Sequence, residues 1–193
     1  MHRGNATRQT ILEQAMRMSS LYGLEGVTIG GLAAALSMSK SGLFSHFGSK
    51  ESLQVEILRA AAQRFTQQVV APALAGPPGE PRVRALFEGW LDWSRGLPGG
   101  CLFVAAAVDM DDRPGPARET LVLVQREWLG VLADAARSAI EEGHFRPDLD
   151  PAQFAFEAYA LLLGCHHYNR LLHDPRALER THNAFEALLY AAR

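Results

Sequence analysis

The stretch from Thr28 to Lys50 most constrains what this chain can fold into. It reads TIGGLAAALSMSKSGLFSHFGSK, and its apolar residues recur at helical spacing on both sides of a short corner, Ser37 to Ser39. Thr28 and Ser39 stand where the N-caps of two short helices are expected. The stretch therefore predicts two short helices joined by a sharp turn, with a further helix that starts at Lys50.

The second of these helices has an outward face suited to nucleic acid. Leu43 and Phe47 are four residues apart and point into a small core. The opposite face has no acidic residue; it consists of Lys40, Ser41, Gly42, Phe44, Ser45 and His46. A helix-turn-helix places such a face in the major groove of DNA, where negative charge is repelled. The pattern by itself fits equally well a small solvated helix between two core helices.

The residues from Thr28 to Leu53 also resemble the DNA-binding signature of TetR-type (tetracycline-repressor-like) regulators. The resemblance rests on Thr28, on Leu32-Ala33, on Met38-Ser39 and on the block Leu43-Phe44-Ser45-His46-Phe47-Gly48-Ser49-Lys50-Glu51-Ser52-Leu53. There are two departures from the family pattern. Ser37 stands where a glycine is usual, so the turn is strained if that residue needs a positive φ. Phe44 stands where a tyrosine is usual, which removes a hydroxyl group able to bond a phosphate.

The resemblance implies an all-α protein of about nine helices with two domains. Residues 1–49 would form a three-helix helix-turn-helix DNA-binding domain, and residues 50–193 a helical effector-binding and dimerisation domain. Double-stranded DNA is the implied partner. We expect phosphate contacts from Thr28, His46 and Lys50, base-edge contacts from Lys40, Ser41, Gly42 and Ser45, and further contacts from Ser39 and Phe44. Lys50 lies in the first turn of its helix, where the helix dipole disfavours a cation, and a phosphate contact would explain it there.

The distribution of charge agrees with a DNA-binding head on a separate body. The net charge is −2, but residues 1–50 carry five basic and two acidic side chains, which gives +3 and leaves −5 for the remainder. The two cysteines, Cys101 and Cys165, are too few for a disulfide scaffold. We find no signal peptide and no apolar run long enough to span a bilayer, and so expect a cytoplasmic protein with no membrane partner.

The remainder of the chain reads as helices separated by proline and glycine. Pro72 to Arg82, PALAGPPGEPR, predicts a loop. Asp150-Pro151 and Asp174-Pro175 predict N-caps followed by proline at the start of the eighth and ninth helices. The eighth helix is apolar nearly all round over residues 152–164, which indicates burial on more than one side. Helices eight and nine therefore predict a symmetric homodimer, and a two-fold protein reads a pseudo-palindromic DNA site.

The TetR resemblance implies a pocket for a small-molecule effector in the body. Seven residues combine apolar bulk with a few polar tips, as pockets do: Trp90, Trp93, Phe103, Met110, Trp128, Tyr159 and His166. Each of them is equally explained as core. No paired charges stand out, so we expect a mostly apolar or aromatic effector. Cys165, His166 and His167 are adjacent on a helix and point about 100° apart, so they cannot all converge on one ion by themselves, and a metal site there would need Cys101 or the dimer partner. We expect no metal and no cofactor.

These patterns predict a ligand-responsive transcriptional regulator, a homodimeric repressor that a small effector releases from its operator. The alternative is a helical interaction or small-ligand carrier module without sequence-specific DNA binding. We expect no enzymatic activity, because the sequence contains no G-x-S-x-G, no H-E-x-x-H, no P-loop and no glycine-rich dinucleotide turn.

Overall fold

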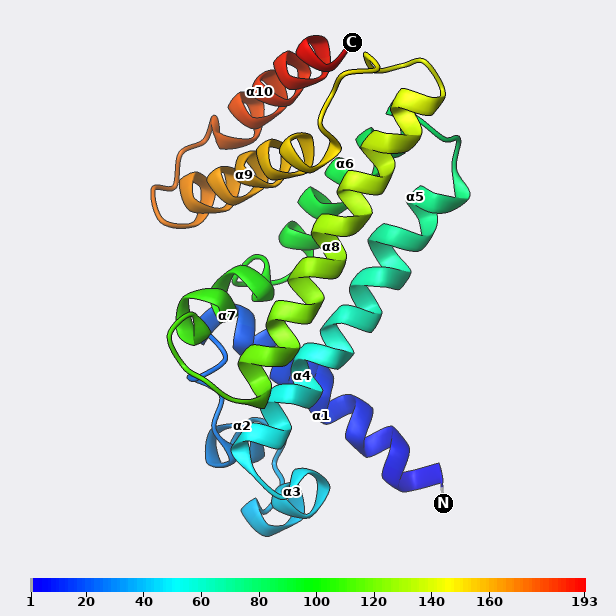
Figure 1. The fold of residues 1–193 in the computed structure, drawn as a ribbon. Coiled ribbons are helices and arrows are strands. Elements are labelled where there is room, and N and C mark those ends of the chain that lie inside the picture. Colours follow the sequence, from blue (N-terminus) through cyan, green and yellow to red (C-terminus); the bar gives the residue numbers. More distant parts are fainter. Residues whose placement is uncertain (1) are drawn as a thin grey trace. The chain divides into compact units, whose positions relative to one another are not determined.

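All regular elements of this computed structural model are helices; it describes the backbone of residues 2–193 and the side chains of residues 8–193 (Figure 1). The helices are α1 (His2–Tyr22), α2 (Ile29–Ala35), α3 (Lys40–Phe47), α4 (Lys50–Phe65), the π-helix η1 (Thr66–Val70), α5 (Ala71–Ala75), α6 (Glu80–Gly96), α7 (Leu102–Met110), α8 (Pro116–Glu141), α9 (Pro151–Arg170) and α10 (Ala177–Ala192). The segment α4–η1–α5 runs without a break, so the described residues form nine separate helical rods. The predicted all-α class and helix number are confirmed.

The chain packs as two compact units. One unit comprises Met1–Arg64 with Leu97–Val124, and the other Phe65–Gly96 with Gln125–Arg193. Helices α4 and α8 each contribute residues to both units. The predicted boundary at residue 49 concerns functional domains rather than packing, and it stays a prediction.

Side-chain caps define the two short helices of the first unit. The Thr28 hydroxyl accepts a hydrogen bond from Gly31 N at 3.0 Å, and the Ser39 hydroxyl accepts one from Gly42 N at 3.0 Å. Both predicted caps are therefore confirmed, and each satisfies one backbone donor that a helix start leaves open. Leu32 and Leu43 are completely buried. The apolar residues of α2 and α3 thus form the small core that their spacing predicts.

The turn between α2 and α3 holds a strained residue. Ser37 has φ 54°, in the left-handed region that a side chain disfavours. Backbone hydrogen bonds keep it there: Ser37 N donates to Ala34 O at 3.2 Å and Met38 N to Ala33 O at 2.9 Å. The positive φ on which the expected strain depends is therefore confirmed.

The predicted loop from Pro72 to Arg82 is wrong at both ends. Helix α5 continues to Ala75 and α6 begins at Glu80, so only residues 76–79 are non-helical. Proline inside a helix normally clashes with the preceding turn. Here the wider turn of η1 comes first, and Ala71 N donates to Thr66 O, five residues back. Pro72 therefore enters at the start of α5, where a proline is tolerated.

Aromatic packing forms the centre of the second unit. Phe87 of α6 and Phe185 of α10 stack with ring centroids 3.7 Å apart and planes 2° from parallel. Phe65 meets the indoles of Trp93 and Trp128 edge-on, at 5.4 and 5.0 Å between centroids. These contacts join residues from four segments that are far apart in the sequence.

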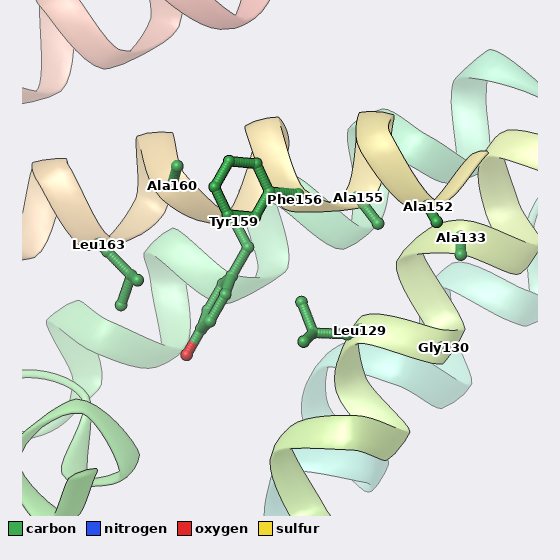
Figure 2. A pocket seen from close by; sticks show the side chains of 9 residues that line it. All are labelled: Leu129, Gly130, Ala133, Ala152, Ala155, Phe156, Tyr159, Ala160 and Leu163. Carbon is green, nitrogen blue, oxygen red and sulfur yellow. The ribbon is translucent and has the colours of Figure 1, made fainter. Parts of the chain in front are cut away.

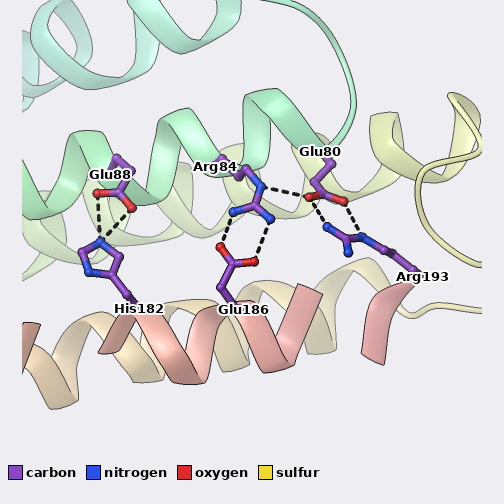
Figure 3. A network of polar contacts seen from close by, with 6 residues as sticks. All are labelled: Glu80, Arg84, Glu88, His182, Glu186 and Arg193. Atoms are coloured by element: carbon purple, nitrogen blue, oxygen red, sulfur yellow. Dashed lines mark hydrogen bonds and ion pairs between the residues drawn. The ribbon is translucent and has the colours of Figure 1, made fainter. Parts of the chain in front are cut away.

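A network of charged side chains links α6 to α10 (Figure 3). Arg84 pairs with Glu186 through two hydrogen bonds and with Glu80 at 2.9 Å. Glu80 also accepts from Arg193, at 2.6 and 2.8 Å. Further along the helices, His182 Nε2 lies 2.9 Å from Glu88. The hydrogen bond from Arg193, and then that from Arg84, hold the pKa of Glu80 below its usual value despite partial burial.

Replacing Ser37 with glycine should stabilise the protein by about 0.5–1 kcal/mol. Glycine relieves the left-handed strain of about 1–2 kcal/mol, and the greater freedom of the unfolded chain offsets part of the gain. The measurement is the free energy of unfolding in urea. As the control, Ala34→Gly on the exposed side of α2 should lose about 1 kcal/mol. A Ser37→Gly protein no more stable than the parent would show that the turn carries no strain.

Replacing Glu80 with glutamine should weaken folding at neutral pH, by up to about 1 kcal/mol for a surface network. Because the folded-state pKa of Glu80 lies below the unfolded value near 4.5, its ionised form contributes stability above that value. The contribution is lost as the pH falls through the lowered folded-state pKa. The difference between parent and variant should therefore be present at pH 7 and vanish in strong acid. Glu141→Gln, at an exposed carboxylate of α8, serves as the control.

Candidate nucleic-acid interface and effector groove

The outward face of α3 is open to solvent and free of acidic side chains. Ser39, Lys40, Ser41, Phe44 and Ser45 are exposed, and Gly42 and His46 are half-buried. Phe44 is 52% exposed, whereas its neighbour Leu43 is completely buried. The face is therefore made of small polar groups, one lysine and one exposed ring.

Lys40 lies close to the other short helix. A Cβ added at Gly30 of α2 would lie 3.2 Å from Lys40 Cε, which is tighter than an ordinary contact. Gly30 weakens α2 by propensity, but it leaves space for the lysine stem beside the helix. Among the polar groups, the Ser45 hydroxyl donates to Gly42 O at 2.7 Å and the Ser39 and Ser41 hydroxyls lie 3.3 Å apart.

Arg8 of α1 supports the end of α3. Its guanidinium donates to His46 O at 2.6 Å, pairs with Glu56 at 3.1 Å and lies 4.8 Å from the centroid of the Phe47 ring. The Arg8 side chain is therefore engaged in contacts within the first unit. The sequence did not reveal this supporting role, because the partners are far from Arg8 along the chain.

Lys50, a predicted phosphate contact, is bound to Glu25 in this structure. Its amine donates to the backbone oxygen of Glu25 at 2.9 Å and to the carboxylate at 2.9 Å. The side chain remains 40% exposed. A phosphate would therefore either share the ammonium group with Glu25 or displace the carboxylate.

Glu25 is the polar centre of the turn between α1 and α2, and the sequence did not single it out. Gln54 donates to its carboxylate at 2.8 Å, Arg113 pairs with it at 3.1 Å, and its backbone N–H donates to Asp109 at 3.0 Å. The hydrogen bond from Lys50, followed by that from Gln54, lowers the pKa of the Glu25 carboxyl. Thr28, exposed and three residues further on, is placed by this turn.

The seven residues predicted for the effector pocket lie in different places. Phe103 and Met110 belong to the first unit, and the other five to the second. Trp93 and Trp128 pack against Phe65. Of the other three residues in the second unit, Tyr159 lines an open groove, and Trp90 and His166 line a smaller cavity.

The open groove has a volume of about 570 Å³ and lies between α8 and α9 (Figure 2). It is lined by Leu129, Gly130, Ala133, Ala152, Ala155, Phe156, Tyr159, Ala160 and Leu163. Its only polar side-chain group is the Tyr159 hydroxyl, which donates to Gln125 at 3.0 Å. Phe156 and Leu163 remain 67% and 38% exposed. The all-round apolar pattern of the eighth predicted helix was the signal that could have indicated this groove.

Three further features concern metals, thiols and membranes. Within residues 8–193, no three His, Cys, Asp or Glu side chains are grouped so as to hold a metal ion. Cys101 and Cys165 are buried free thiols. In the described chain, no helix combines the length and the apolar character needed to cross a bilayer.

Two family models match the chain. Residues 11–57 match the model described as "Bacterial regulatory proteins, tetR family", and residues 79–185 match "Tetracyclin repressor-like, C-terminal domain". The second match alone spans more than half of the chain.

The chain is also similar to individual proteins. The transcriptional repressor AcnR of Corynebacterium efficiens is 40% identical over 63 residues, a segment that covers 33% of this chain and only 34% of AcnR. The chain therefore matches about a third of the length of this relative.

Solved structures match over nearly the whole chain. A TetR transcriptional regulator from Chloroflexus aurantiacus is 27% identical, with a TM-score of 0.84 over 98% of this chain and 96% of that one. AibR, solved in complex with isovaleryl coenzyme A and operator DNA, is 23% identical with a TM-score of 0.74, over 96% and 98% of the two chains. From the capped helix-turn-helix, the all-helical body and the two family models that cover them, we conclude that this chain belongs to the TetR family of transcriptional regulators.

Proposed function

We propose that this regulator is a homodimeric repressor that binds a pseudo-palindromic operator and is released by a small, mostly apolar or aromatic effector. The observation that carries the DNA-binding part is the outward face of α3, which is exposed and has no acidic residue. Such a face meets the phosphate-lined major groove without electrostatic repulsion. Binding to such an operator would require the protein to be in the cytoplasm.

The roles of the DNA-contacting residues follow from their positions on the two short helices. Lys40, Ser41, Gly42 and Ser45 lie on α3 or at its start and would meet base edges, with Ser39 and Phe44 beside them. Thr28, His46 and Lys50 would contact phosphates. For Lys50 the contact involves an exchange, because a phosphate competes with the Glu25 carboxylate for the same ammonium group.

The dimer would form through α9 and α10. Tyr168 of α9, Leu171 directly after α9 and Tyr190 of α10 are exposed outside the groove lining, with Tyr190 at 79%. Large apolar side chains in such numbers on neighbouring helices mark an interaction surface. Two copies that bury them around a two-fold axis would present two heads to successive turns of DNA, about 34–36 Å apart.

The effector would bind in the groove between α8 and α9. Its volume falls in the range of small-molecule sites, and its apolar lining with one hydroxyl group suits a ligand that is mostly hydrocarbon. A ligand that favours one of two conformations shifts their populations, and release from DNA follows when the favoured one binds DNA more weakly. That AibR was solved with both a ligand and operator DNA supports a fold able to hold both.

Selection from a random pool of DNA duplexes at near-physiological salt should enrich an inverted repeat. The double variant Lys40→Ala, Ser41→Ala should lose or relax the enriched sequence, because both residues face the base edges. Lys50→Ala should instead weaken all duplexes alike and reduce the slope of log affinity against log salt by about 1.8, which is about 0.9 for each of the two Lys50 contacts of the dimer. A folded protein that enriches no sequence would contradict the proposal and favour a helical module without sequence-specific DNA binding.

Narrowing the groove should weaken ligand binding there. Gly130 lines the groove, and a Cβ added to it meets no atom within 4 Å. We expect Gly130→Leu to weaken binding of the neutral fluorescent probe N-phenyl-1-naphthylamine at least tenfold, measured by fluorescence titration.

The matched control for the groove is Gly130→Ala. It gives the same gain in helix propensity, about 1 kcal/mol, but leaves the groove open, so the probe should bind as in the parent. Equal probe binding by the leucine and alanine variants would show that the groove is not the ligand site.

A further inference from the structure

Phe44 places an open aromatic ring on the outward face of α3. It is 52% exposed, whereas Leu43 and Phe47 of the same helix are buried at 0% and 7% exposure. The small core beneath α3 is thus filled by its two neighbours, and about half of the Phe44 surface remains in contact with water. The backbone of Phe44 has a separate structural part, because its oxygen accepts a hydrogen bond from Gly48 N at 2.8 Å and so helps to end the helix.

The ring lies among the residues expected to meet base edges. Lys40 and Ser41 precede Phe44 by four and three residues, a spacing that places all three on one side of a helix. Both of these residues are exposed, as is Ser45 directly after Phe44. If this side of α3 enters the major groove, the ring of Phe44 reaches the base edges together with the lysine and serine side chains.

A phenylalanine ring in the major groove has one suitable partner. The ring has no hydrogen-bond donor or acceptor, and so gains nothing from a charged phosphate or a polar base edge. It would also cost free energy to cover a polar base group without replacing the water bonded to it. The only apolar group that the bases present in the major groove is the C5-methyl group of thymine. Contact between the ring and this methyl group removes apolar surface of both from water, which is favourable.

We propose that Phe44 is a specificity-determining residue that recognises the methyl group of one thymine in each half-site of the operator. The inference rests on the proposed DNA binding and adds to it the identity of one base. The hydrogen-bonding side chains Lys40 and Ser41 would read the neighbouring base edges, and Phe44 would read an apolar feature that they do not recognise.

The test uses uracil, which differs from thymine only by the missing methyl group. Starting from an operator enriched by the selection described above, each thymine of the half-site is replaced in turn by uracil, in both half-sites at once. At one position the replacement should lower the affinity of the parent protein about 16-fold, from about fourfold for each methyl group that loses its contact. The measurement is titration of labelled duplexes followed by fluorescence anisotropy. The ratio of the two affinities should change little with salt, because the contact involves no charge.

Phe44→Ala should bind the thymine and uracil forms of that position equally, because the apolar partner of the methyl group is gone. Phe44→Leu keeps an apolar side chain and should retain part of the preference. The matched control is Tyr22→Ala, which removes another exposed ring, 64% exposed at the end of α1, and should keep the full preference for thymine. The uracil series on the parent protein tests the contact even if a variant fails to fold.

The outcomes separate this inference from the proposed DNA binding. A protein that enriches an operator but binds it equally well with uracil at every thymine position would overturn the inference and leave the DNA binding intact. An undiminished thymine preference in folded Phe44→Ala would also overturn it, because another residue would then contact the methyl group. A folded protein that enriches no operator would overturn both.

Discussion

The DNA-binding head depends on the hydrogen bonds that converge on Glu25. Within the turn between α1 and α2, Val27 N donates to Leu24 O at 3.4 Å, and the backbone groups of Glu25 find their partners on other segments. Asp109 accepts from the Glu25 N–H, and Lys50 donates to its carbonyl oxygen. Gly23 allows the approach of Asp109, because a Cβ there would lie 2.2 Å from the carboxylate oxygen.

This arrangement gives Lys50 two possible partners. Exposed ion pairs contribute little, about 0–1 kcal/mol, so a DNA phosphate can compete with the Glu25 carboxylate at small cost. Glu25 would remain bonded to Gln54 and Arg113 after such an exchange. The turn can therefore keep its position when Lys50 contacts DNA, which is what a preorganised binding surface requires.

In the second unit, α9 is buried on one side and exposed on another. One side of this helix packs Phe154, Ala158 and Leu162 into the core. Another side leaves Phe156 and Leu163 exposed along the groove with α8. Exposed apolar area of this kind is costly in water, about 25 cal/mol per Å², and covering it would stabilise either a dimer or a bound apolar ligand.

The sequence by itself determined the helical class, the two short helices of the head and their caps. Local rules govern these features: helical spacing selects Leu32, Leu43 and Phe47 as core, and Thr28 and Ser39 bond groups only three residues away. The strain at Ser37 was also visible locally, since it depends on one backbone angle. The continuation of the helix through Pro72 was not visible in the local sequence, because it depends on the hydrogen bonding of the preceding π-helix η1.

Only the tertiary structure decided which distant side chains meet. The partners of Glu25 come from residues 50, 54, 109 and 113, and no spacing rule connects them with the turn. The same holds for the candidate pocket residues, which the fold distributes between a groove, a small cavity and the aromatic core. Residue type indicates that a tryptophan or histidine is able to line a site. Whether it does so depends on how the helices pack, which is a property of the whole chain rather than of its local pattern.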